Sequence, residues 1–227
     1  MLAALVLASA VSGVPAPAAA DPALAPARRA DFQQEPASND VSRMAQWVLD
    51  TRNNRTLSFM IIDKKNTKIF VFDPNGKLRG ATPALLGGAV GDDSAPGIGE
   101  RKLSSISPEE RTTPAGRFVA ALDHNLGGKD ILWVDYANAI SLHRVVTSNP
   151  KENRARRLAS PTTEDNRISY GCINVPARFF DKIVIPAFKK TNGIVYILPE
   201  TRPIGAVFPS FDLRTPAAPS RDKAHAP

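Results

Sequence analysis

The strongest constraint on the fold is a change in the spacing of apolar residues at Leu57. Two runs rich in β-branched and aromatic residues, Ser58–Asp63 and Lys68–Asp73, lie on either side of the polar turn at residues 64–67, and this pattern predicts a β-hairpin. Further strands are expected at Lys77–Leu86, Phe118–Leu122, Ile131–Tyr136, Ala139–Leu142 and Gly193–Leu198. We therefore expect one mainly β domain over residues 56–200.

The segments outside this domain have a different composition. Apolar residues recur at helical spacing in Asp40–Asp50, with Asn39 or Asp40 placed to cap the start of a helix. The Ala/Pro-rich stretches on either side predict loosely ordered chain. The predicted flanking segments are a linker at residues 21–39, a short N-terminal helix at 40–55 and a Pro/Ala-rich tail at 201–227.

The first twenty residues have the features of a signal peptide. The apolar run Met1–Val11 leads into an Ala-x-Ala-like cleavage pattern before Asp21, which predicts export to the periplasm or cell envelope. No Lys or Arg precedes Arg28, so a disordered Ala/Pro leader is the alternative. The run is too short to span a bilayer, and we expect no transmembrane span in the mature chain.

The chain is basic, with a formal net charge of +7 and a sequence pI of about 9.8. Such a balance favours anionic surroundings, such as cell-wall polymers or a membrane surface. The sequence has no basic helix and no basic patch interleaved with aromatic residues, so we do not expect a nucleic acid partner.

Cys172 is the only cysteine among the 227 residues. A single thiol forms no internal disulfide, so it is either a small buried hydrophobe or a nucleophile. Gly171 removes side-chain bulk beside the sulfur and lets the N–H groups of Tyr170, Gly171 and Cys172 face one point. That arrangement is what an oxyanion hole requires, and it favours the nucleophile.

A candidate base lies upstream of this thiol. The run Ala139–His143 reads as a strand that ends in an imidazole. A thiol reacts as its thiolate, which a neighbouring imidazolium stabilises. His143 and Cys172 are therefore the predicted catalytic pair.

The segment Thr147–Asn166 joins the two, and it is polar and rich in arginine. It is either a solvated surface helix or a lid whose arginines meet substrate carboxylates, and its position between His143 and Cys172 favours the lid. A zinc site from His124, His143 and Cys172 lacks a close pair of ligands. We expect no metal site and no cofactor.

A strand-ending His143, a spacer and then Ser169-Tyr170-Gly171-Cys172-Ile173-Asn174 resembles the catalytic signature of the L,D-transpeptidases, which carry a YkuD-type catalytic domain. Thr113–Phe118 is similar to the turn that precedes the active-site strands in that family. The resemblance covers about residues 57–199. Two features depart from the family pattern: Tyr170 stands where histidine is usual, and the spacer after His143 is longer.

The resemblance implies a β-sandwich or barrel with a few short helices. It also implies acyl transfer on peptidoglycan stem peptides through a thioester on Cys172, in cell-wall cross-linking or remodelling. The residues that it implicates beside His143 and Cys172 are Ser169, Tyr170, Gly171 and Asn174 in the nucleophile loop, and Ser141, Arg144 and Arg167 in substrate binding.

Other functions remain as alternatives. Water in place of an acceptor amine would make the protein an L,D-carboxypeptidase. The Tyr170 departure also fits a wall-binding or scaffold module with an altered site. A sortase-like enzyme is disfavoured because the Thr-Leu-x-Thr-Cys lead-in is absent, and a papain-like peptidase because its cysteine precedes its histidine.

Overall fold

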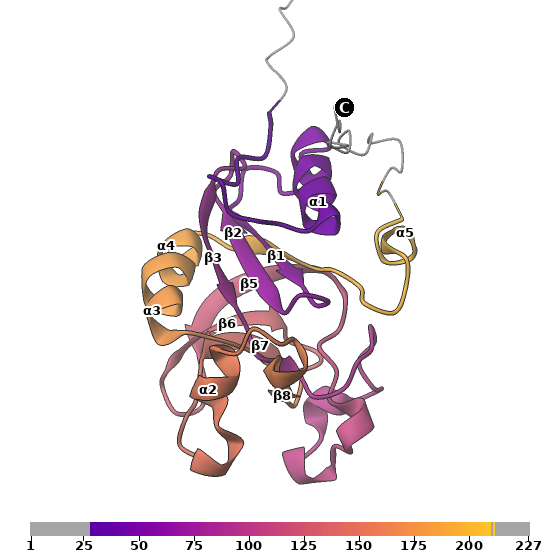
Figure 1. Cartoon of the computed structure of the whole chain (residues 1–227), viewed down its shortest axis with the longest axis vertical. Coiled ribbons are helices and arrows are strands. Elements are labelled where there is room, and N and C mark those ends of the chain that lie inside the picture. Colours follow the sequence, from indigo (N-terminus) through magenta and orange to yellow (C-terminus); the bar gives the residue numbers. More distant parts are fainter. Residues whose placement is uncertain (1–27, 210, 212–227) are drawn as a thin grey trace, which may run out of the picture.

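The computed structural model describes residues 28–209 and residue 211. The predicted signal peptide at 1–20 and much of the predicted linker and tail lie outside these residues. In chain order the helices and strands are α1 (Asn39–Asp50), β1 (Phe59–Asp63), β2 (Lys68–Phe72), β3 (Leu78–Pro83), β4 (Leu86–Gly87), β5 (Gly116–His124), β6 (Asp130–Asp135), β7 (Ile140–Arg144), α2 (Arg154–Leu158), β8 (Arg167–Ser169), β9 (Ile173–Val175), α3 (Ala177–Phe179), α4 (Ile185–Phe188), β10 (Gly193–Ile197) and α5 (Ile204–Val207). The expectation of a mainly β fold with a few short helices is confirmed (Figure 1).

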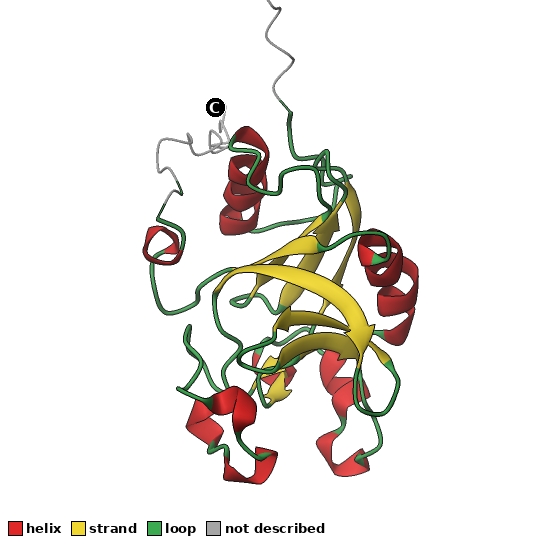
Figure 2. Ribbon diagram, turned by 180° about the vertical axis from the view of Figure 1, so that it is seen from behind, coloured by secondary structure: helices red, strands yellow, loops and turns green. Residues whose placement is uncertain are grey.

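Eight of the strands form one sheet in the order β3-β2-β1-β10-β5-β6-β7-β9. The pairs β1–β10 and β7–β9 are parallel, and the other neighbours in this sheet are antiparallel. Leu85, just after β3, exchanges two backbone hydrogen bonds of 2.9 Å with Asn174 of β9. Because β3 and β9 are opposite edges of the sheet, this bridge brings the edges together, and the sheet curves strongly (Figure 2).

The central strands are buried on both faces. In β1, Met60 and Ile62 belong to the core cluster inside the curved sheet, whereas Phe59 and Ile61 belong to a second cluster on the outer face. The strands β2 and β10 divide their side chains in the same way. Strands covered on both faces are nearly continuously apolar, which explains the run Phe59–Ile62.

Helix α1 covers the outer face of the sheet (Figure 1). It begins after Ser38, whose hydroxyl accepts the Val41 N–H at 3.2 Å, so Ser38 is the cap and not Asn39 or Asp40. The helix ends at Asp50 instead of near residue 55. Trp47 packs against the rings of Tyr196, Phe208 and Phe211, so that this helix and the end of the described chain share one apolar cluster.

A buried ion-pair group lies beside the turn that follows β1. We call Lys64, Asp92, Arg167 and Glu200 the charge cluster. The Lys64 Nζ is 2.8 Å from Asp92 Oδ1 and 3.3 Å from Glu200 Oε1, and the Lys64 side chain is 0% exposed. Glu200 also pairs with Arg167. The sequence pattern placed Lys64 in a polar hairpin turn, and the structure buries it.

Asp92 fixes the chain after β10. Its carboxylate accepts the backbone N–H groups of Glu200, Thr201 and Arg202 at 2.8–2.9 Å. Burial would raise the pKa of Asp92, but the hydrogen bonds from Lys64, from the Thr201 hydroxyl and from these N–H groups outweigh it and hold the pKa well below its usual range. The carboxylate therefore stays charged and keeps this segment attached.

Within residues 28–209 and 211, no helix combines the length and apolar character that crossing a membrane requires.

Candidate functional site

Cys172 lies in the short connection between β8 and β9, and its backbone path depends on the preceding glycine. Gly171 has φ +123°, a conformation that L side chains rarely adopt. A Cβ at this position would lie 2.7 Å from the Thr112 carbonyl oxygen and 2.8 Å from Ile140 Cδ1. Only glycine fits both the dihedral angle and the space.

Side chains around the loop tie its backbone down. Ser169 Oγ donates to the Cys172 carbonyl at 2.5 Å, and Asn174 Nδ2 donates to the same oxygen at 3.3 Å. Thr113 Oγ1 donates to the Gly171 carbonyl at 2.8 Å. Ser169, Thr113 and Asn174 are all buried, so these hydrogen bonds hold the loop from the interior of the domain.

One expected oxyanion donor is already occupied. The Gly171 N–H donates to Ser169 Oγ at 3.1 Å, so it does not face the same point as its neighbours, and that part of the prediction is wrong. In the part of the chain that the structure describes, no hydrogen bond is formed by the N–H of Tyr170 or of Cys172. These two backbone donors of the loop therefore remain without a partner among the described residues.

His143 is placed by β7, which runs parallel to β9 with His143 opposite Asn174. Its Nδ1 is 2.8 Å from the carbonyl oxygen of Arg144. Because a carbonyl only accepts hydrogen bonds, Nδ1 carries the proton, and in the neutral ring Nε2 is the basic nitrogen. The local backbone therefore selects the tautomer that can accept a proton from a thiol.

The environment of the sulfur favours its charged form. Cys172 Sγ is 3.6 Å from Ser141 Oγ and 3.5 Å from the Ala139 carbonyl oxygen. Burial would raise the pKa of the Cys172 thiol, but the interaction with His143 and hydrogen bonds from Ser141 outweigh it and lower the pKa. Burial would likewise lower the pKa of His143, whereas the interaction with Cys172 and the bond to Arg144 raise it. Both shifts favour a thiolate beside an imidazolium.

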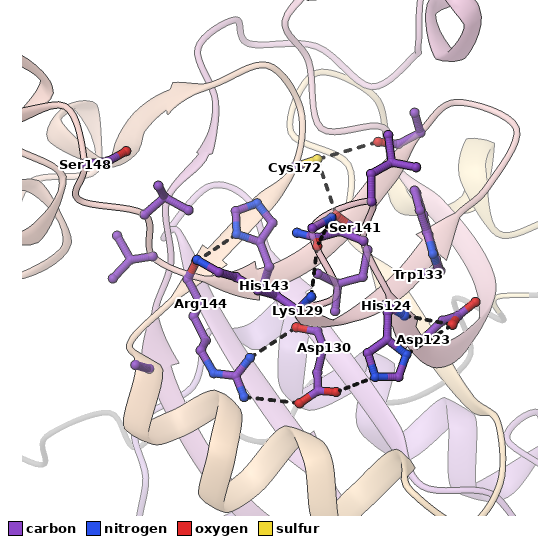
Figure 3. Close-up of a pocket in the computed structure, with 18 of the residues that line it drawn as sticks. Asp123, His124, Lys129, Asp130, Trp133, Ser141, His143, Arg144, Ser148 and Cys172 are labelled. Atoms are coloured by element: carbon purple, nitrogen blue, oxygen red, sulfur yellow. Dashed lines mark hydrogen bonds and ion pairs between the residues drawn. The ribbon is translucent and has the colours of Figure 1, made fainter.

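Both side chains line one pocket of about 1020 Å³. Ser141 and Arg144 line it as well, and its far end is formed by the β5–β6 hairpin with Asp123–Gly127, Lys129 and Asp130 (Figure 3). Cys172 is half-buried, so the sulfur is sheltered and still borders this space. A substrate segment that enters the pocket can therefore reach the thiol.

Two arginines that the resemblance implicated in substrate binding are engaged elsewhere. Arg167 is outside the pocket lining, because its guanidinium pairs with Glu200 and donates to the Lys64 carbonyl at 2.8 Å. Arg144 lines the pocket, but its guanidinium pairs with Asp181 at 2.6 Å. The same guanidinium contacts Asp130 at 3.6 Å (Figure 3). What Arg144 gives to the site is its backbone carbonyl.

Tyr170 also has a partner of its own. The guanidinium of Arg111 lies over its ring, 4.1 Å from the centroid. Tyr170 is half-buried and does not line the pocket, so its side chain does not take the place of a second histidine beside the thiol.

The predicted lid, Thr147–Asn166, lies at the end of the molecule opposite α1 and carries α2 (Figure 1). Only its first residues, Thr147 and Ser148, line the pocket. Arg154 does not face the pocket: its Nη1 donates to Asn174 Oδ1 at 2.9 Å, which connects the segment to the nucleophile loop. The segment therefore contacts the nucleophile loop through Arg154.

Metal-ligating side chains are not gathered in this region. His124 contacts Asp130 at 3.1 Å on the exposed β5–β6 hairpin, apart from the thiol. No group of three or more His, Cys, Asp or Glu residues able to hold a metal ion is present among the described residues.

Thr113 is the residue that the sequence reasoning missed. The sequence pattern indicates only a turn at Thr113–Phe118 that resembles one of the family, whereas in the structure Thr113 is fully buried and its hydroxyl bonds the Gly171 carbonyl. The signal that could have found it is the Thr-Pro-x-Gly pattern at residues 113–116, because a threonine at a conformationally fixed turn is placed to bond a neighbouring backbone.

Comparisons with known proteins give matches in structure only. No family model matches the sequence, and no curated protein sequence matches it significantly. Among solved structures, an L,D-transpeptidase of Enterococcus faecium aligns at 15% identity and TM-score 0.36, covering 62% of this chain and 49% of that one. The helical cell shape determining protein Pgp2 of Campylobacter jejuni aligns at 13% identity and TM-score 0.42, covering 73% and 56%. An L,D-transpeptidase of Xylanimonas cellulosilytica aligns at 14% identity and TM-score 0.37, covering 63% and 60%.

This chain thus spans about half to three fifths of the length of the solved structures that it matches.

Proposed function

We propose that this protein is a cysteine-dependent acyl transferase, with Cys172 as nucleophile and His143 as its base. The observation that carries the proposal is that both side chains line one pocket and that their interaction lowers the pKa of the thiol while it raises the pKa of the imidazole. A reactive cysteine needs this microenvironment, whereas a structural buried cysteine has none of it.

The first half of the reaction forms a thioester. His143 Nε2 takes the thiol proton, and the thiolate of Cys172 attacks the substrate carbonyl carbon. The carbonyl electron pair moves onto oxygen, where the free N–H groups of Cys172 and Tyr170 are the donors for the resulting anion. When the tetrahedral intermediate collapses, the C–N bond breaks and the leaving amine takes its proton from His143.

The second half releases the acyl group. An acceptor amine, deprotonated by His143, attacks the thioester carbonyl, and the C–S bond breaks to return the thiolate. Water in place of the amine gives hydrolysis and makes the protein a carboxypeptidase. The bond between His143 Nδ1 and the Arg144 carbonyl keeps the ring in one orientation through both halves.

The substrate that we propose is a peptidoglycan stem peptide, and the reaction is L,D-transpeptidation in the cell envelope. The support for this class is the resemblance of Ser169–Asn174 and of the Thr113–Phe118 turn to the L,D-transpeptidase signature. The net charge of +7 agrees with an anionic wall polymer as the surrounding partner.

The test has two stages. In the first, wild-type protein and Cys172→Ala are incubated with a carbapenem and examined by intact mass; addition of the whole ring-opened drug is expected for the wild type alone. In the second, a synthetic stem tetrapeptide is supplied with a D-amino acid. An exchanged product supports transpeptidation, and a shortened peptide supports the carboxypeptidase.

Absence of the carbapenem adduct and of both products would contradict the enzyme. Retained binding of that protein to purified wall would then support the scaffold module.

A further inference from the structure

The peptide group between Gly171 and Cys172 is held from one side only. A trans peptide is planar, so its carbonyl and its N–H point in opposite directions. The Gly171 carbonyl is bound by Thr113 Oγ1 at 2.8 Å, and the Cys172 N–H is therefore aimed away from Thr113. It forms no hydrogen bond within the described residues, and it belongs to the residue whose sulfur borders the pocket.

The Thr113 hydroxyl can point in only one direction. It accepts the Gly87 N–H at 2.9 Å, so its single hydrogen is left for the Gly171 carbonyl. The backbone carbonyl of Thr113 accepts from Lys64 Nζ at 2.8 Å, which ties the residue to the charge cluster. Thr113 is 0% exposed, and water does not compete for these bonds.

We propose that Thr113 is a positioning residue: by holding the Gly171 carbonyl, it aims the Cys172 N–H at the oxygen that becomes negative during acyl transfer. The inference rests on the proposed function. Its physical basis is that an oxyanion donor acts only when it is oriented before the charge develops. Thr113 itself touches neither the substrate nor the thiol.

This role is separate from activation of the thiol. The groups that shift the pKa of Cys172 are His143 and Ser141, and Thr113 is not among them. Loss of the Thr113 hydroxyl should therefore leave the thiolate in place while it frees the Gly171–Cys172 peptide to rotate. Two reagents can distinguish these effects, because one requires an oxyanion and the other does not.

The experiment compares acylation of Cys172 by p-nitrophenyl acetate with its alkylation by iodoacetamide. In acylation the thiolate adds to the ester carbonyl, an oxyanion forms, and p-nitrophenolate leaves as the thioester is made. In alkylation the thiolate displaces iodide from carbon in one step, and no oxyanion forms. The ratio of the two rates reports the oxyanion donor alone.

The variants are Thr113→Val, which keeps the shape and removes the oxygen, and Thr113→Ser, which keeps the oxygen. Thr112→Val is the matched control, because that neighbouring buried hydroxyl bonds the Asp93 carbonyl and not Gly171. We expect Thr113→Val to lower the acylation rate by roughly 10²-fold with alkylation unchanged. Thr113→Ser and Thr112→Val should keep the wild-type ratio.

An unchanged ratio in Thr113→Val would overturn the inference. Thermal unfolding checks each variant, and Thr113→Ala, which removes the same oxygen and places no methyl group at its position, replaces Thr113→Val if the latter does not fold. A wild-type thiol that iodoacetamide alkylates but the ester never acylates would instead overturn the proposed function, so the two failures are distinct.

Discussion

The charge cluster and the Cys172–His143 pair are two polar centres of this molecule that differ in how completely their polar groups are paired. In the cluster, Lys64 has two carboxylates and two carbonyls within reach, and its side chain is fully buried. At the pair, the sulfur interacts with His143 and lies 3.5 Å from the Ala139 carbonyl oxygen and 3.6 Å from Ser141 Oγ, and two nearby N–H groups have no partner in the described structure. Thr113 contacts both centres.

This difference shows that one group of polar residues can stabilise the fold while another provides the reactive thiol. A buried charge whose partners are all satisfied has nothing to offer a substrate, and it fixes the backbone around it. A half-buried thiol with unused donors close by is less well satisfied, and that leaves capacity for a ligand. We therefore expect substitutions in the cluster to change stability and substitutions at the pair to change reactivity.

The largest effect is expected from Cys172→Ala. Without the sulfur no thioester forms, so acylation by p-nitrophenyl acetate should fall to the level of the buffer reaction. The free energy of unfolding should change little, because alanine keeps the Cβ and removes only one half-buried sulfur atom. Stopped-flow release of p-nitrophenolate and urea denaturation measure the two. Residual acylation of the folded variant would show that the reactivity does not depend on the Cys172–His143 pair.

The next effect is expected from Lys64→Met. Removing one partner of a buried ion pair leaves uncompensated charge, which typically costs about 3–5 kcal/mol. Lys65→Met is the matched control: Lys65 is half exposed and pairs with Asp40 at 3.3 Å, so its loss should cost less than about 1 kcal/mol. Urea denaturation compares them. Equal costs for the two lysines would show that the cluster does not support the fold.

A smaller effect is expected from His143→Gln on the titration of the thiol. In the wild type, the rate of alkylation by iodoacetamide should rise with pH at a midpoint below the ordinary cysteine pKa of about 8.5, because the pKa of Cys172 is lowered. The substitution should move the midpoint up towards that value and slow alkylation at neutral pH by about tenfold.

The control for this titration is His124→Gln, which changes an exposed histidine on the β5–β6 hairpin. A midpoint that stays in place in His143→Gln would mean that another group activates the sulfur.

The smallest effect is expected from Arg144→Gln. Its guanidinium forms partly exposed ion pairs, and His143 uses only its backbone carbonyl. Stability should fall by less than about 1 kcal/mol, and acylation should stay within about twofold of the wild type. If the acylation rate fell much more with a stem peptide than with p-nitrophenyl acetate, the Arg144 guanidinium would bind substrate, as the resemblance implied.

Local signals in the sequence were sufficient for much of the sheet. The hairpin of β1 and β2 and the strand β10 were predicted from runs rich in β-branched and aromatic residues and from turn residues. The parallel pairings β1–β10 and β7–β9 were not, because they join residues far apart in the chain and leave no local pattern. The end of α1 at Asp50 was missed because Thr51–Leu57 contains no residue that forbids a helix.

For the site, the sequence indicated which residues to examine but not their partners. Cys172 and His143 were chosen from their residue types and order, and their roles stay predictions. The expected donor Gly171 was wrong because the Ser169 hydroxyl takes its N–H, a choice of side-chain rotamer. The sequence did not indicate that Arg167 lies outside the pocket lining, because its partner Glu200 is distant in sequence and only folding brings the two together.

The position of β10 has a consequence for how the molecule is assembled. This strand is the last one among the described residues, yet it occupies the middle of the sheet between β1 and β5. A nascent polypeptide that has emerged only as far as β9 therefore lacks the strand that pairs with both β1 and β5, and its two half-sheets meet only at their other edges, through the Leu85–Asn174 bridge and the β4–β8 pair. The eight-stranded sheet can therefore be completed only after β10 has been synthesised, because its central pairings join residues far apart in the sequence.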